Sequence, residues 1–288
     1  MKVLNRKPFI GIISFLIVLL TMPLGHAAMI LMEKMFGHEY VFKAALLLGL
    51  IGVVLLIAGL KTSKETKATF LGLFAGLFIW TGWIEFAYVF VAKRVAIQPI
   101  IENGEVVTKP EYLLMPSSIG FLAVLVLYFL FNGKTQCVFF RWWQRNMRLN
   151  FVKREKAGKS RPYALTTATE IIAILWFFYL VLLIVYDKGI FGDRHIATYI
   201  VAFGSLLWSL FLFIKLIRIQ KYAYAIRYAI PTVIIFWTFI EILGRWNLFK
   251  EIWIEPLKYW IEIVLIFAVF VLLIFISLLD KRKKKVAS

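Results

Sequence analysis

Two glutamates lie inside long apolar stretches of this sequence, and both follow the same dipeptide. The two contexts are Trp80-Thr81 before Glu85 and Trp237-Thr238 before Glu241. An ionisable side chain at bilayer depth costs several kcal/mol unless it is paired or hydrated, so such residues point to a functional site. A carboxylate there can take up a proton or attract a cation. We therefore expect Glu85 and Glu241 to be proton-linked or gating groups that face a shared cavity in the outer half of the membrane.

The number of residues between dipeptide and glutamate differs by one between the two contexts. On an ideal helix one residue is about 100° of rotation, so the sequence alone leaves the equivalence of Glu85 and Glu241 open. Trp80 and Trp83 lie within about two turns of Glu85, and we expect them to line the same pocket. Most of the other tryptophans lie near span ends, as expected of residues at the membrane interface.

His26, Glu262 and Arg245 are predicted at a similar depth to these glutamates. A histidine and several carboxylates at one level could carry protons or hold a divalent cation. The alternative is that they form interhelical hydrogen bonds and Glu–Arg pairs that only stabilise packing. We expect no resident metal or cofactor, because three histidines are too few for paired haem ligands or a histidine-rich di-iron centre. The common sequence motifs of hydrolases and ATPases are also absent.

The elements that must position these residues are membrane-spanning helices. Hydrophobic residues make up 62% of the chain and the mean hydropathy is +0.83, which excludes a soluble domain of this length. Each apolar stretch is long enough to cross a hydrocarbon core of about 30 Å. We predict eight spans, at residues 9–31, 42–60, 69–92, 113–131, 165–186, 196–217, 222–244 and 259–280. The first resembles a signal peptide with a site after Ala27, but its apolar run continues to Met32 and favours an uncleaved span.

The chain carries a net charge of +18, and most of its 34 lysines and arginines fall on the side of the predicted spans that contains both termini. The positive-inside rule therefore predicts cytoplasmic N- and C-termini in a multi-pass protein of the plasma membrane. The expected partners of the basic residues are the bilayer and its anionic inner-leaflet lipids. Nucleic acid is not expected, because the adjoining spans already explain the basic and aromatic residues.

Short matches between the two halves indicate an internal duplication. Phe36-Gly37 and Gly49 recur as Phe191-Gly192 and Gly204, and Lys93 and Pro99 recur as Lys250 and Pro256. We predict an all-α fold of two parallel four-helix units, residues 1–131 and 165–288, joined by a basic interfacial linker at 132–164. Four spans return the chain to its starting side, so the axis relating the units should run along the membrane normal.

The segments between spans carry three further signals. Asn103-Gly104 between β-branched residues is typical of a hairpin with a tight turn. Residues 245–258 mix aromatic and charged side chains, as an interfacial helix does. The aromatic and basic run that begins at Phe139 in the linker predicts a helix on the inner membrane surface.

These observations favour a protein that binds or translocates a small solute or ion near the interface of its two halves. One alternative is a membrane-embedded enzyme that acts on a lipid-like substrate at the outer leaflet, with His26 and the glutamates in acid–base roles. Another is a non-catalytic subunit or assembly factor that docks a membrane partner, and a homo-oligomer is also compatible. A polar cavity open to one face would favour solute passage, and a lateral opening towards lipid would favour an enzyme. A dry, packed interface would favour a non-catalytic subunit.

Overall fold

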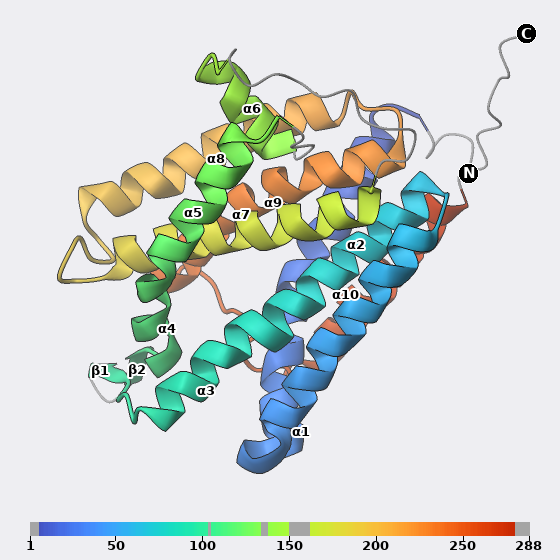
Figure 1. The fold of residues 1–288 in the computed structure, drawn as a ribbon. Coiled ribbons are helices and arrows are strands. Elements are labelled where there is room, and N and C mark those ends of the chain that lie inside the picture. Colours follow the sequence, from blue (N-terminus) through green and yellow to red (C-terminus); the bar gives the residue numbers. More distant parts are fainter. Residues whose placement is uncertain (1–5, 103–104, 134–137, 150–161, 280–288) are drawn as a thin grey trace, which may run out of the picture.

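The computed structural model describes residues 6–102, 105–133, 138–149 and 162–279, and these form a bundle of helices (Figure 1). In this part of the chain, eight helical segments are long and apolar enough to cross a membrane: Phe9–Gly37, Tyr40–Lys61, Glu65–Arg94, Pro110–Phe131, Tyr163–Tyr186, Ile196–Leu216, Tyr222–Arg245 and Trp260–Leu278. The prediction of eight spans is confirmed. The first span ends later than expected because its helix continues through the polar residues Glu33 and Lys34.

Several spans do not coincide with single helices. The elements are α1 (Phe9–Lys61), α2 (Glu65–Ile79), the π-helix η1 (Trp80–Glu85), α3 (Phe86–Arg94), α4 (Pro110–Leu114), the 3₁₀ helix η2 (Met115–Ser118), α5 (Ile119–Phe131), α6 (Val138–Asn146), α7 (Tyr163–Tyr186), α8 (Ile196–Leu216), α9 (Tyr222–Arg245) and α10 (Trp260–Leu278). The first two spans are the two parts of α1. The third span contains α2, η1 and α3, and the fourth contains α4, η2 and α5.

Both copies of the Phe-Gly pair are sites of chain reversal. Gly37 has a φ of 58° and breaks α1 between its two spans, and Gly192 has a φ of 101° in the connection between α7 and α8. A residue with a Cβ rarely adopts such angles, so glycine suits both positions. The start of α1 and the end of α10 lie towards the same end of the bundle as α6, while the Gly37 turn lies towards the other (Figure 1).

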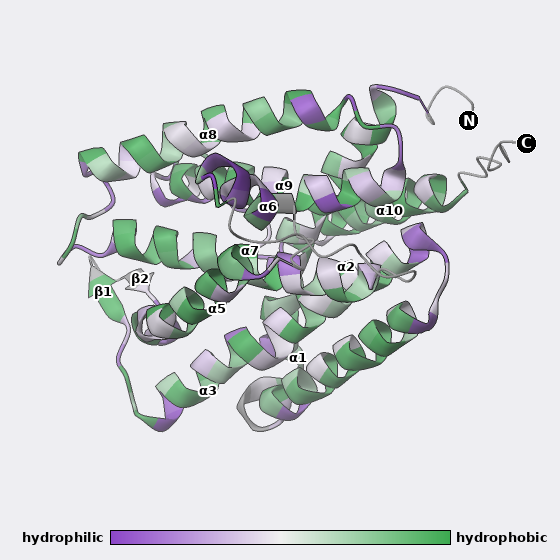
Figure 2. Cartoon of the chain, turned by 45° about the horizontal axis from the view of Figure 1, so that its top comes forward, coloured by the Kyte–Doolittle hydropathy of each residue, from purple (hydrophilic) through white to green (hydrophobic). Residues whose placement is uncertain are grey.

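The centre of the bundle is formed by α9 and the first span of α1, which pack against each other. Small residues allow helices to approach closely. Gly72 and Gly76 on α2 face Ala164 and Ala168 on α7 so tightly that an added Cβ would clash with the α7 backbone. These two glycines, four residues apart, therefore form a packing contact within the chain. The outer helices, α8 and α10 among them, present mainly hydrophobic residues (Figure 2).

The predicted hairpin and a helix in the linker are confirmed, while the position of that helix on the inner membrane surface stays a prediction. Strands β1 (Ile100–Glu102) and β2 (Glu105–Thr108) pair antiparallel as a hairpin, whose Asn-Gly turn lies outside the described residues. The linker contains α6, a hydrophilic helix in Figure 2, which buries Phe139 and Phe140 and exposes Arg141. The remainder of the linker at 150–161 also lies outside the described residues.

The prediction of an interfacial helix at 245–258 is wrong. After Arg245 the chain forms a series of turns that continue to Tyr259. Trp253 and Pro256 are both buried, and Trp253 packs on Trp237 of α9 with ring centroids 5.0 Å apart. Proline provides no backbone N–H for a helix, and the burial of Trp253 against α9 favours a loop that folds back over the end of that helix.

Candidate functional site

A histidine and a carboxylate from different halves of the sequence meet near the end of α9. His26 Nε2 in the first span lies 3.3 Å from Glu241 Oε1, and the His26 and Glu241 side chains remain 30% and 23% exposed. Trp237 Nε1 donates to the same carboxylate oxygen at 2.6 Å, and its ring stacks on His26 with centroids 6.2 Å apart. These three residues form the His26 group.

A second group, with a tyrosine in place of the histidine, surrounds Glu85. Tyr179 of α7 donates its hydroxyl to Glu85 Oε1 at 3.5 Å, and the Tyr179 ring lies 6.1 Å from that of Trp80. Glu85 and Trp80 are both buried. Glu85, Trp80 and Tyr179 form the Tyr179 group. Each group thus contains a tryptophan, the glutamate that follows it and a polar side chain from an adjacent helix.

The π-helix η1 explains how two different spacings produce the same arrangement. In a π-helix the backbone hydrogen bonds join residues five apart, while in an α-helix they join residues four apart. Phe86 N accordingly donates to Thr81 O, five residues back. Glu85 therefore follows Trp80 by one turn of π-helix, as Glu241 follows Trp237 by one turn of α-helix. The extra residue is absorbed locally and does not rotate Glu85 away from its tryptophan.

The two groups act on each other electrostatically. The charges of Glu241, Glu85 and Glu251 all affect His26. Tyr112 at the start of α4 extends the Tyr179 group, since its hydroxyl lies 3.1 Å from that of Tyr179. Tyr179 has one hydroxyl proton, which it can donate to Tyr112 or to Glu85, so the two tyrosines and the carboxylate form a small hydrogen-bonded cluster.

The loop after α9 adds another carboxylate beside the His26 group. Trp253 Nε1 donates to Glu251 Oε2 at 3.1 Å, and the Glu251 carboxylate lies against Gly244, where a Cβ would clash with it. Burial raises the pKa of Glu251 above its ordinary value, and the nearby charge of Glu241 raises it further. Three carboxylates, those of Glu241, Glu85 and Glu251, therefore act on His26.

Several residues predicted for the site have other roles. Arg245 donates through Nε to Asp193 Oδ1 at 3.1 Å and stacks on the Tyr186 ring, so it anchors the connection between α7 and α8. Glu262 is exposed in the first turn of α10. Thr238 donates to Ile234 O within its own helix, and Thr81 is half-buried in η1.

Trp83, which was expected to line a pocket with Glu85, packs on the second span of α1. Its indole Nε1 donates to Leu46 O at 3.1 Å, and its ring lies against Gly49 on the second span of α1. Trp83 packs on α1, while Trp80 faces the rings of Trp176 and Tyr179 on α7.

Sequence reasoning missed Tyr179, Tyr112 and Glu251. A search for charged residues inside spans passes over tyrosines, and Glu251 lies between spans. The repeat held a signal for Tyr179, because aligning Phe36 with Phe191 places His26 opposite Val181, two residues from Tyr179.

A separate ion pair at the opposite end of α9 was also missed. Arg227 donates to Glu65 Oε1 and to Thr69 Oγ1 of α2, both at 2.7 Å, and its guanidinium lies 4.8 Å from the Tyr163 ring centroid on α7. Arg227 is buried, although it carries a full charge within a span. This contact joins the first two turns of α2, α7 and α9. It lies at the end of the bundle where α1 also begins (Figure 1).

Within the described part of the chain, no three His, Cys, Asp or Glu side chains are arranged to hold a metal ion. The chain matches no known family model, no curated protein and no solved structure. Its eight apolar helices have the architecture of a multi-pass membrane protein.

Proposed function

We propose that this protein binds, and passes across the membrane, a small cation or a proton-linked solute at the interface of its two sequence halves. The contact between His26 and Glu241 carries the proposal, because it joins the first span to the seventh and stays partly accessible. Glu85 and Glu251 lie within electrostatic range of the same histidine. An excess of carboxylates over cationic groups stabilises a positive ligand, and a histidine beside them can exchange a proton with it.

The packing of the bundle supports a duplication that builds this interface from two equivalent units. If the first four spans correspond to the last four, the contact of α1 with α9 should have a counterpart between α7 and α2, and that contact exists. The contact of α1 with α10 likewise corresponds to that of α7 with α5. We infer a pseudo-twofold axis along the membrane normal, with the His26 group and the Tyr179 group as its related halves.

We also propose that both termini face the cytoplasm of a plasma-membrane protein, since basic residues concentrate on the side of the chain ends. This side includes α6, whose aromatic residues face the bundle and whose Arg141 is exposed towards anionic lipid headgroups. Cysteines at the exposed positions Lys64 and Gly189 test the orientation after Cys137 is replaced. Gly189 should be labelled from outside intact cells and Lys64 only after permeabilisation, and the reverse result would overturn it.

The alternative of an enzyme with a lipid-like substrate predicted a lateral opening lined by His26 and carboxylates. A groove about 420 Å³ in volume opens along the two spans of α1, but its lining contains neither His26 nor a carboxylate. This groove therefore gives no support to chemistry on a lipid by His26.

The proposal is tested with purified protein reconstituted in vesicles that contain the pH dye pyranine and hold a proton gradient. Na⁺, K⁺, Mg²⁺ and tetramethylammonium are added outside in turn, and we expect one of them to dissipate the gradient. Glu241→Gln and Glu85→Gln should abolish this, because an amide neither releases a proton nor carries a full negative charge. Glu255→Gln is the matched control, since Glu255 pairs with Lys258 on the exposed surface.

The melting temperature of each variant in detergent separates function from scaffolding. A functional role predicts lost flux with an unchanged melting temperature. If the melting temperature falls in step with the flux, or if none of the four ions moves protons in the unaltered protein, the proposal is contradicted.

A further inference from the structure

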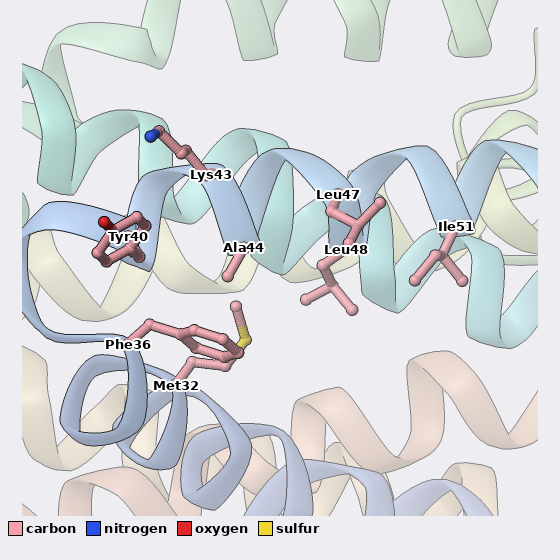
Figure 3. Close-up of a pocket in the computed structure, with 8 residues that line it drawn as sticks. All are labelled: Met32, Phe36, Tyr40, Lys43, Ala44, Leu47, Leu48 and Ile51. Atoms are coloured by element: carbon pink, nitrogen blue, oxygen red, sulfur yellow. The ribbon is translucent and has the colours of Figure 1, made fainter.

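The break at Gly37 folds the two spans of α1 against each other and leaves an apolar groove between them (Figure 3). Met32 and Phe36 form one wall, and the other wall consists of Tyr40, Ala44, Leu48 and Ile51. The groove has a volume of about 420 Å³, within the range of roughly 300–1,000 Å³ that is usual for small-molecule sites. From Tyr40 to Ile51 it follows three turns of helix, about 16 Å at 1.5 Å per residue.

The residues around the groove are mainly apolar and exposed, as expected of a site that faces the hydrocarbon of a bilayer. Leu47, which also lines the groove, is 58% exposed, and Leu50 and Val54 on the same span are 47% and 64% exposed. Ala44 is the smallest side chain in the lining, and its position between larger residues leaves space at the middle of the wall. An acyl chain fits a narrow apolar channel of this kind.

One end of the groove is basic. Lys43 contributes to the lining, and its exposed ammonium group lies 5.0 Å from the centroid of the Tyr40 ring. Lys93 of α3 lies 6.0 Å from the ring of Phe42, the neighbour of Lys43, and Lys34 and Arg94 are also exposed near the ends of their spans. Glu33 is the half-buried acidic neighbour of Lys34. Lysine stems extend along apolar surface and place their charge at headgroup level.

We propose that this groove binds one molecule of an anionic glycerophospholipid, with an acyl chain along Ala44, Leu48 and Ile51 and the phosphate beside Lys43. The proposal does not depend on the site around His26, whose residues do not line the groove. A bound lipid here would stabilise the two spans of α1 in their folded-back arrangement.

Native mass spectrometry of the full-length protein, after incubation with phosphatidylglycerol or phosphatidylcholine, tests the proposal. We expect preferential retention of phosphatidylglycerol by about fivefold, the effect of one lysine on an anionic headgroup. Lys43→Gln should abolish the preference, and Ala44→Phe should remove the retained lipid of both kinds by filling the groove. Ala44→Val is a milder replacement if Ala44→Phe does not fold.

The matched controls are Lys215→Gln and Ala58→Phe. Lys215 also lies over an aromatic ring, that of Phe211, and Ala58 is an exposed residue on the same span as Ala44. Both controls should retain phosphatidylglycerol as the unaltered protein does. Equal retention of the two lipids by the unaltered protein, or an unchanged preference in Lys43→Gln, would overturn the proposal.

Discussion

His26 Nε2 lies 3.3 Å from Glu241 Oε1, although the two residues belong to the first and seventh spans. Tyr179 and Glu85 form the related contact between the fifth and third spans at 3.5 Å. In both, the glutamate lies one helical turn after a tryptophan that contacts the polar partner. The interface of the halves thus contains two carboxylates held by different partners, a basic imidazole in one case and a phenol in the other.

The His26–Glu241 contact should contribute a measurable coupling energy. We expect a double-mutant cycle of His26→Gln and Glu241→Gln to give about 1 kcal/mol, since the pair is hydrogen-bonded but partly exposed. The measurement is the free energy of unfolding in mixed micelles. Glu262→Gln combined with His26→Gln is the control, because Glu262 is exposed on another helix, and it should show no coupling. An equal value for both cycles would refute the contact.

The π-helix should tolerate the loss of one residue. Deleting Ile84 shortens the Trp80–Glu85 spacing to that of Trp237 and Glu241, so η1 can become α-helical while the flanking helices keep their orientation. We expect the melting temperature to change by only a few degrees. Deleting Ile240 from the regular helix α9 should prevent folding, because it rotates the following residues by about 100°. Similar behaviour of the two deletions would contradict this account of η1.

The buried pair of Arg227 and Glu65 should stabilise the opposite end of the bundle. Glu65→Gln leaves the Arg227 side chain, which is 9% exposed, without its counter-charge. We expect a loss of about 1–2 kcal/mol after allowance for the 36% exposure of the Glu65 side chain. The measurement is again the free energy of unfolding in mixed micelles. Glu255→Gln breaks an ion pair whose side chains are more than half exposed, and no change in stability is expected there. Equal effects of the two substitutions would argue against a buried pair.

Glu251 should make stability depend on pH. Its pKa is raised by burial and by Glu241, so the folded protein binds the proton more tightly than the unfolded chain does. This contribution to the free energy of unfolding is fully present below the ordinary glutamate pKa of about 4.3 and is lost as pH rises through the raised pKa. We expect the melting temperature to decline over that range and Glu251→Gln to flatten the decline. Glu255→Gln should keep the slope, and parallel curves for the unaltered protein and Glu251→Gln would be evidence against the effect.

The sequence determined the elements of this protein because bilayer thickness dictates the length and polarity of a span. It predicted all eight spans and the hairpin before α4, and it singled out Glu85, Glu241 and His26 as polar groups within the spans. These properties are local, since hydropathy, turn chemistry and the cost of a buried charge depend on a residue and its neighbours in the chain. The orientation, the duplication and the function remain predictions.

Tertiary structure decided which of these residues meet. Whether His26 contacts Glu241 depends on how the first and seventh spans cross, and no pattern within either span specifies that. The π-helix places Glu85 one turn after Trp80, as Glu241 lies one turn after Trp237. The numbers of residues between tryptophan and glutamate nevertheless differ by one. Packing also places Tyr179 beside Glu85, although a tyrosine does not stand out in an apolar sequence. It gives Trp83 a partner on α1 and Arg245 a partner in the connection between α7 and α8. Side-chain partners depend on packing across helices distant in sequence, and only the folded chain determines them.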